Sequence, residues 1–187
     1  RSGTGRSYWY RAYQGAAGKQ VEDIVCRDTD EAGYAQARDE IEFAQWVGAQ
    51  VRTLRKLEFQ VADKAVAGVL VELYNAGLLR AGLCVVGTLG FMAWLNELGA
   101  RAVTARTQDI DLAARQDLKL AAPKSFMEVV ERTKMGFCLV PGLSPKDPAS
   151  SVKLPGNQGL RVDVLTHGAH TGQPVAIAPL QWHAQTI

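Results

Sequence analysis

The stretch that most constrains the fold is residues 82–112, where an apolar strand, a glycine turn, a helix and a second strand follow one another. The turn begins at Gly87, and the second strand carries Asp109 and Asp111 on either side of Ile110. Because successive side chains of a strand alternate between its faces, the two aspartates project together while Ile110 points the other way. Two carboxylates on one face, opposite a glycine turn that opens a helix, predict a site for a divalent metal ion and a polyphosphate.

A third carboxylate strengthens this prediction. Asp163 stands singly between two valines in another apolar stretch, about residues 160–165. A charged group in an apolar strand must be exposed on one face or bound by a ligand, so simple solvation is the alternative interpretation. The other Asp-x-Asp pair, Asp28 and Asp30, lies in a polar run ahead of a helix, where helix capping explains it.

The turn itself has two interpretations. A glycine after an apolar strand most often makes a tight turn and nothing more. Here Gly87 is followed by Thr88 and by an apolar helix, so backbone N–H groups and a hydroxyl converge at a helix N-terminus. Such an arrangement binds phosphate well, because these N–H groups have no partner within the helix.

Composition excludes several classes of protein. Of the 187 residues, 47% are hydrophobic and 21% charged, as in an ordinary globular domain, and a net charge of +2 does not by itself predict a nucleic-acid surface. Three widely spaced cysteines form neither a disulfide framework nor a zinc cluster, so we expect a reducing, cytoplasmic location. Cys84, within an apolar run, is interpreted as a small buried hydrophobe. No apolar run of about 18 residues occurs, and we therefore expect no membrane contact.

Hydrophobic periodicity, capping residues and glycines predict the secondary structure. We expect a β-hairpin near the N-terminus and a long helix capped by Thr29 or Asp30, then a second helix that ends at Gly77. Residues 173–187 show no clear element, and we expect the chain to be cut short there. The remaining elements are expected as strands at about 82–86, 108–113, 136–140, 152–154 and 160–165, and as helices from the turn to about 97 and at about 124–133.

The order of apolar strand, glycine turn, helix, Asp-x-Asp and a later strand with a third acid resembles the nucleotidyltransferase superfamily, which has the DNA polymerase beta-like fold. The resemblance implies an α/β (α+β) fold with a mixed sheet flanked by helices, behind an N-terminal β-hairpin and helical region. We expect that region at 1–79 and the catalytic domain at 80–187, truncated at its C-terminus. The Thr-Gln-Asp-Ile-Asp-Leu sequence around the acids looks most like a bacterial branch of uncharacterised nucleotidyltransferase-like domains and AbiEii-type toxins.

The resemblance also implies a reaction, namely Mg²⁺-dependent (or Mn²⁺-dependent) transfer of a nucleoside monophosphate from an NTP such as ATP to a hydroxyl. In such enzymes the positions of Asp109, Asp111 and Asp163 hold two metal ions, and the third acid lies beneath the attacking hydroxyl. The glycine turn, here Gly87 and Thr88, holds the β- and γ-phosphates. Thr88 departs from the usual glycine or serine, and its extra methyl group crowds the phosphate approach.

Lys153 is the cation that we expect to neutralise triphosphate charge, because it lies between the two acidic strands in sequence; Arg161 is a further cation of this region. The acceptor is an RNA, a protein or a small molecule, and one form of the hypothesis is a toxin with an antitoxin partner. The alternative is a non-catalytic nucleotide- or nucleic-acid-binding module that retains the fold. The N-terminal aromatic and basic residues pack on the following helices in one interpretation and contact RNA in the other.

Overall fold

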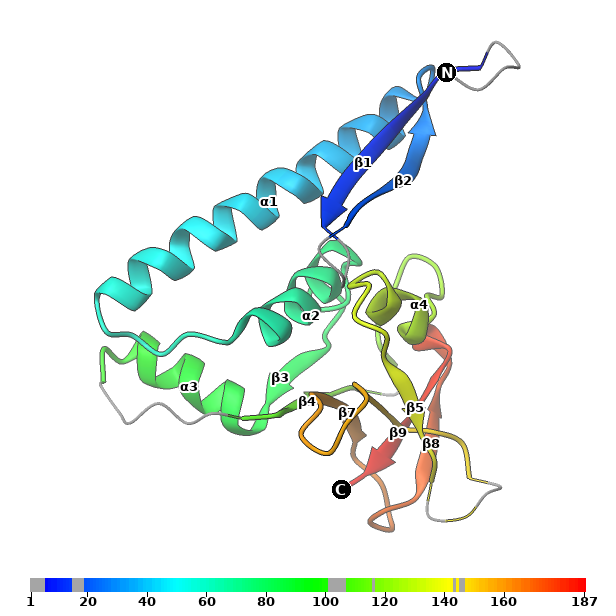
Figure 1. The fold of residues 1–187 in the computed structure, drawn as a ribbon. Coiled ribbons are helices and arrows are strands. Elements are labelled where there is room, and N and C mark those ends of the chain that lie inside the picture. The colour runs from blue at the N-terminus through cyan, green and yellow to red at the C-terminus, as the bar shows by residue number, and fades with distance from the viewer. Residues whose placement is uncertain (1–5, 15–18, 101–106, 116, 143, 145–146) are drawn as a thin grey trace. The chain divides into compact units, whose positions relative to one another are not determined.

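The computed structural model describes residues 6–14, 19–100, 107–115, 117–142, 144 and 147–187 (Figure 1). The chain divides into two compact units, Arg1–Thr53 and Leu54–Ile187, which are described separately. The predicted domain boundary at 79/80 lies inside the second unit. Among the described residues, no helix has the length and apolar character needed to cross a membrane.

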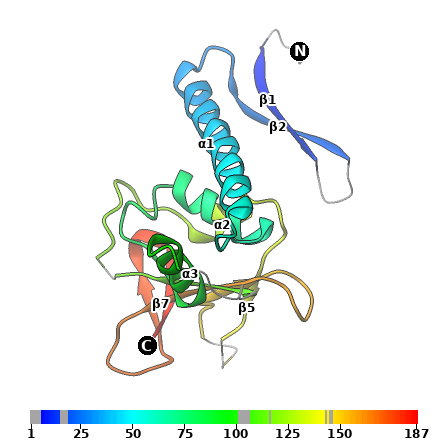
Figure 2. The same ribbon diagram turned by 90° about the vertical axis from the view of Figure 1, so that its left-hand side faces the viewer.

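The first unit is a hairpin followed by most of a long helix. Strand β1 (Tyr8–Gln14) pairs antiparallel with β2 (Gln20–Arg27), and Figure 2 shows the two strands side by side. Helix α1 (Glu31–Lys56) then begins after Asp30, whose carboxylate accepts a hydrogen bond of 2.9 Å from the backbone N–H of Gly33. The predicted hairpin and long helix are therefore confirmed, and Asp30 is the one of the two cap candidates, Thr29 and Asp30, that caps the helix.

The second unit is a seven-stranded mixed sheet with helices packed on it, which confirms the predicted fold class. Five strands lie in the order β3-β4-β7-β6-β5, and β9 pairs with both β7 and β8. Strand β7 is parallel to β4 and β9, and the other pairs are antiparallel. The elements are α2 (Lys64–Asn75), β3 (Cys84–Val86), α3 (Gly87–Glu97), β4 (Asp109–Ala113), α4 (Phe126–Glu131), β5 (Cys138–Val140), β6 (Ser151–Lys153), β7 (Arg161–Thr166), β8 (Pro174–Ile177), a short 3-10 helix (Ala178–Leu180) and β9 (Trp182–Thr186).

One face of this sheet forms the core of the unit. The alternate residues Ile110 and Leu112 of β4 are fully buried, as are Val162 and Val164 of β7. Helices α2 and α4 lie in contact with each other and supply further buried side chains to the same core (Figure 1). Burial of apolar surface is the main stabilising term, and here it requires β4 and β7 to turn a single face inward.

Two expectations from the sequence are wrong. The C-terminal segment, expected to lack an element, forms β8 and β9, and β9 extends the sheet beside β7. Its inward positions are Trp182, Ala184 and Thr186, so a small and a polar residue weaken the apolar alternation that would reveal the strand. Cys84 was expected to be buried but is exposed, because the alternation of β3 turns it away from the core.

Truncation of a core strand should be costly. We expect Leu112→Ala to lower the free energy of unfolding by about 2–5 kcal/mol, because it removes buried methyl groups and leaves a cavity. The matched control is Leu139→Ala on the edge strand β5, where the leucine is 55% exposed and the expected loss is within about 0.5 kcal/mol. Urea denaturation of the three proteins measures both values, and equal losses would contradict this assignment of the core.

Candidate active site

The face of the sheet opposite the core carries the predicted acids. Parallel pairing of β4 with β7 sets Asp111 directly opposite Asp163 and Asp109 directly opposite Arg161. All four side chains therefore project from the same face, away from the buried side chains of Ile110 and the other core residues. The three predicted carboxylates come from two separate stretches of the sequence. In the structure they lie on one face of two adjacent strands.

Gly87 lies against this acidic face. Its neighbour Val86 pairs with Asp111, and Gly87 itself begins α3 with φ +62°, in the left-handed region that favours glycine. A Cβ atom added to Gly87 would stand 2.2 Å from Oδ2 of Asp111. The glycine therefore serves two purposes, since it allows the turn and leaves room for the carboxylate.

The same turn presents the N-terminus of α3. The first N–H groups of a helix lack intrahelical acceptors and carry a partial positive charge, which suits an anionic group. Thr88 is half-buried in the first turn of α3. Gly90 allows the helix to pack closely on β3, because an added Cβ would stand 3.0 Å from the carbonyl oxygen of Val85.

Asp163 is held by two neighbours that the sequence alone did not link to it. The hydroxyl of Ser151, directly across from it on β6, donates a hydrogen bond to Oδ1 of Asp163. Arg161 Nε donates to the same oxygen at 2.9 Å, and its Nη2 donates to the Ser151 hydroxyl at 3.0 Å. These three side chains form a closed hydrogen-bonded triangle on the acidic face.

The charges on this face affect one another. The pKa of Asp111 is raised above its ordinary value, first by desolvation and then by the negative charges of Asp163 and Asp109, while Arg161 opposes the shift. Burial and like charges both disfavour an ionised carboxyl group. Asp163 and Asp109 are therefore close enough to Asp111 for their negative charges to raise its pKa, in addition to the larger effect of desolvation.

The residues present fit a divalent cation by their chemistry. Carboxylate oxygens are the ligands that Mg²⁺ prefers, and the backbone of Gly87 lies close to the Asp111 carboxylate. In the part of the chain that the structure describes, however, no three His, Cys, Asp or Glu side chains are gathered as one metal-binding group. Asp163 instead directs Oδ1 at Arg161 and Ser151. The three carboxylates therefore suit a metal ion by their chemistry, while one oxygen of Asp163 is already hydrogen-bonded to Arg161 and Ser151.

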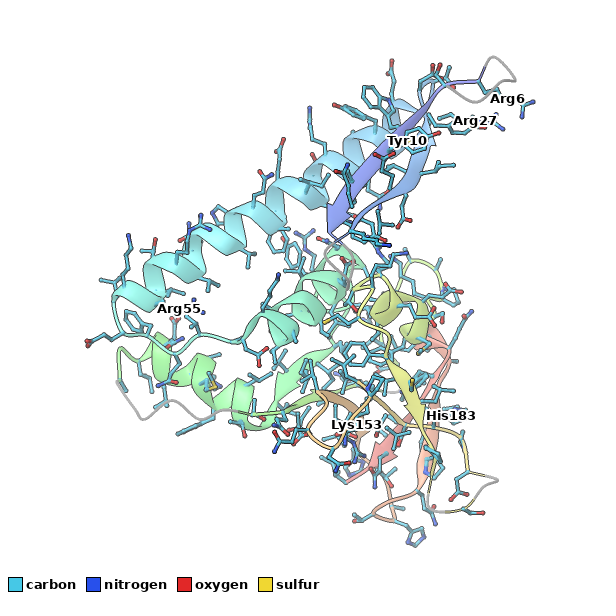
Figure 3. All side chains as sticks on the ribbon, in the orientation of Figure 1. Arg6, Tyr10, Arg27, Arg55, Lys153 and His183 are labelled. Carbon is cyan, nitrogen blue, oxygen red and sulfur yellow. The ribbon has the colours of Figure 1, made fainter. Side chains whose placement is uncertain are left out.

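Lys153 lies on the other side of the acids from the glycine turn. It occupies β6, and β4 and β7 separate it from β3. Neighbouring strands are about 4.8 Å apart, so β3 and β6 are separated by about 14 Å. Lys153, labelled in Figure 3, donates a hydrogen bond of 3.2 Å from Nζ to the carbonyl oxygen of Asn157 in the β6–β7 turn. The structure thus brings Gly87 to Asp111 and does not bring Lys153 to the same end of the site.

Sequence reasoning overlooked Ser151 and left Arg161 as one cation among several. The alternation Arg-Val-Asp in β7 was a usable signal, because it sets Arg161 and Asp163 on one face, two residues apart. No comparable signal exists for Ser151. Its place beside Asp163 depends on pairing between strands whose facing residues lie 12 positions apart in the chain.

The fold and the site define an α+β domain in which a strand–glycine–helix turn adjoins a carboxylate-bearing face. A family model described as nucleotidyltransferase matches residues 64–187, which is more than half of the chain and includes the whole acidic face. The chain belongs to this nucleotidyltransferase family. Comparison of the chain with curated proteins and with solved structures found no match.

Gly87→Ala should separate backbone strain from crowding of Asp111. We expect it to lower the free energy of unfolding by about 1–2 kcal/mol, since alanine disfavours positive φ, and to displace the Asp111 carboxylate. Gly99→Ala is the matched control, because Gly99 has φ +65° but nothing lies within 4 Å of an added Cβ.

The two variants should therefore lose similar stability in urea denaturation. Only Gly87→Ala should impair Mn²⁺ binding, which titration calorimetry measures. Equal Mn²⁺ affinity in the two variants would contradict the expectation that the added methyl group displaces Asp111 from a metal-binding position.

Asp111→Asn tests the cost of the charge on the acidic face. Because the folded-state pKa of Asp111 is raised, the folded chain binds more protons than the unfolded chain above the unfolded-state pKa of about 3.9. The stability contributed by this group therefore falls as the pH rises from that value through the raised folded-state pKa. In metal-free buffer we expect Asp111→Asn to raise the free energy of unfolding at about pH 7 and to change it little at about pH 3.

Urea denaturation at the two pH values checks this expectation. An equal change in the free energy of unfolding at both values would contradict it, because a pH-independent effect does not arise from the charge of Asp111.

Proposed function

We propose that this protein is a divalent-metal-dependent nucleotidyltransferase that transfers a nucleoside monophosphate from an NTP to a hydroxyl acceptor. One observation carries the proposal: Asp111 and Asp163 stand directly opposite each other on adjacent parallel strands, with Asp109 on the same face. A fold that needed only stability would not collect three carboxylates on one surface, since each raises the free energy of the others' charged forms. Membership in the nucleotidyltransferase family supports the same conclusion.

In this proposal Asp109 and Asp111 hold the metal, and Asp163 joins them on the acceptor side. Bound Mg²⁺ or Mn²⁺ supplies Lewis-acid stabilisation of the charge that develops on the triphosphate and on the attacking oxygen. Asp163 lies beneath the acceptor hydroxyl and accepts its proton. Most of the rate enhancement then comes from the fixed geometry of β4 and β7, which orients these groups before the substrates arrive.

The phosphate end of the site is assigned to the turn between β3 and α3. The helix N-terminus provides backbone N–H donors beside Asp111, and Thr88 adds a hydroxyl. The closeness of Gly87 to Asp111 supports this assignment, because a triphosphate bound by these N–H donors would lie near the carboxylates that would hold the metal. The departure at Thr88 is accommodated if its hydroxyl, rather than its methyl group, faces the phosphates.

The acceptor end is assigned to the β7–β6 side. Arg161 and Ser151 already hold Asp163 by hydrogen bonds on this side. We propose that an RNA end, a protein side chain or a small molecule presents its hydroxyl to Asp163 from this side of the acidic face. A toxin that acts with an antitoxin partner in the cytoplasm is one form of the proposal.

A second candidate function is a binding module that retains the fold without catalysis. The observation that favours it is the engagement of Asp163 by Arg161 and Ser151, since within the described residues the acids are not gathered as one metal-binding group. This candidate predicts nucleotide binding without release of pyrophosphate. The two candidates therefore differ in a measurable product.

The experiment is thermal unfolding of the chain with each common NTP, with and without Mg²⁺, followed by an assay for released pyrophosphate. At about 100 times its dissociation constant a ligand adds about 2.7 kcal/mol of stability, a rise in Tm of several degrees. We expect a Mg²⁺-dependent rise that Asp109→Asn abolishes. The matched control is Asp28→Asn, an exposed aspartate in the turn before α1, which should retain the full rise.

The outcomes separate the candidates. Pyrophosphate released by the wild type but not by Asp109→Asn supports nucleotidyl transfer. A rise in Tm with or without Mg²⁺ but without pyrophosphate, across RNA, protein and small-molecule acceptors, supports the binding module. The absence of any rise in Tm with nucleotide would contradict both.

A further inference from the structure

Arg161 is a cation that lies on the acidic face itself and forms an ion pair with one of its carboxylates. It lies directly opposite Asp109 in the strand register and two residues before Asp163 in β7. Its guanidinium group donates to Oδ1 of Asp163 at 2.9 Å and to the Ser151 hydroxyl at 3.0 Å. Arg161 therefore already supplies the positive charge that the carboxylates require.

The triangle of Arg161, Ser151 and Asp163 is a built arrangement rather than a loose surface pair. Ser151 is 2% exposed and the Asp163 side chain 16% exposed, so both lie largely out of solvent. The Ser151 hydroxyl accepts from Arg161 and donates to Asp163, which fixes the orientation of both partners. Charge-assisted bonds of this kind are roughly twice as strong as neutral ones.

Arg161 and Ser151 both bind Oδ1 of Asp163, so a metal ion would either replace them at this oxygen or bind the other oxygen close to the guanidinium charge. Each pair of like unit charges at about 4 Å costs about 1 kcal/mol even in a water-like dielectric, and a dication doubles this repulsion. The side chain of Arg161 is 39% exposed, so it can turn toward an anion in solvent, and guanidinium binds phosphate as readily as carboxylate.

We propose that Arg161, seated on Ser151, withholds Asp163 from the divalent-metal site, which gains its third carboxylate ligand only when Asp163 is released. Arg161 is thus a positioning residue that acts through Asp163. This inference rests on the proposed function, since it requires that the acids bind a metal ion. It adds that the metal affinity of the nucleotide-free protein is held low by a residue of the protein itself.

The test is the affinity of the whole chain for Mn²⁺ without nucleotide, measured from free Mn²⁺ by electron paramagnetic resonance. Wild type, Arg161→Gln, Asp163→Asn and the double variant form a complete cycle. We expect Arg161→Gln to tighten Mn²⁺ binding about tenfold in the wild-type background, by removing the repulsion and freeing Asp163. In the Asp163→Asn background we expect a change of no more than about twofold, because only screened long-range repulsion remains.

Two further variants make the result independent of folding defects. Ser151→Ala keeps the arginine but removes its support, and it should tighten Mn²⁺ binding in the same direction by a smaller factor. Arg161→Lys keeps the positive charge and should bind Mn²⁺ within about threefold of the wild type, because charge competition persists. Circular dichroism of each protein verifies the fold.

Unchanged or weaker Mn²⁺ binding by Arg161→Gln would overturn the inference, and so would equal tightening in the Asp163→Asn background. If Mn²⁺ binds the wild type and is lost in Asp109→Asn, either result overturns the inference alone. If no protein of the set binds Mn²⁺, the proposed function fails and the inference fails with it.

Discussion

The register between β4 and β7 is the interaction on which both the core and the acidic face depend. In one register the strands turn Ile110 and Val162 into the core and set Asp111 beside Asp163. A slip of one residue would carry the carboxylates inward and the apolar side chains outward, at a cost of several buried side chains. Hydrophobic burial therefore holds the geometry of a site to which it contributes no chemistry.

The acidic face is also where stability and the proposed function conflict. Desolvation, and then the charges of Asp163 and Asp109, raise the pKa of Asp111 and so make its ionised form less favourable. Neighbouring groups compensate for part of this unfavourable electrostatic energy. Arg161 and Ser151 offset it at Asp163, and the absence of a side chain at Gly87 relieves crowding at Asp111. Destabilised groups that the rest of the fold holds in place are typical of sites selected for binding or catalysis.

Periodicity in the sequence was sufficient wherever a feature depends on neighbours along the chain. The shared face of Asp109 and Asp111, the glycine turn and the aspartate cap of α1 are all local, and each was predicted. Ser151 and β9 were overlooked because their places depend on pairing between distant segments. Sequence order suggested Lys153 as the cation for the triphosphate, and only the strand order shows that β4 and β7 lie between Lys153 and the glycine turn.

That strand order gives the acidic face two unlike ends. On the β3 side the acids meet backbone N–H groups and a glycine, which suit a polyphosphate approaching closely. On the β6 side they meet Arg161, Ser151 and Lys153, which already hold hydrogen bonds to protein atoms. The first end offers the N–H donors of a helix N-terminus to a ligand, while the second must exchange existing bonds to receive one. In the proposed reaction, the nucleotide would therefore bind to a prepared surface, and the acceptor side would be completed only after Asp163 is released.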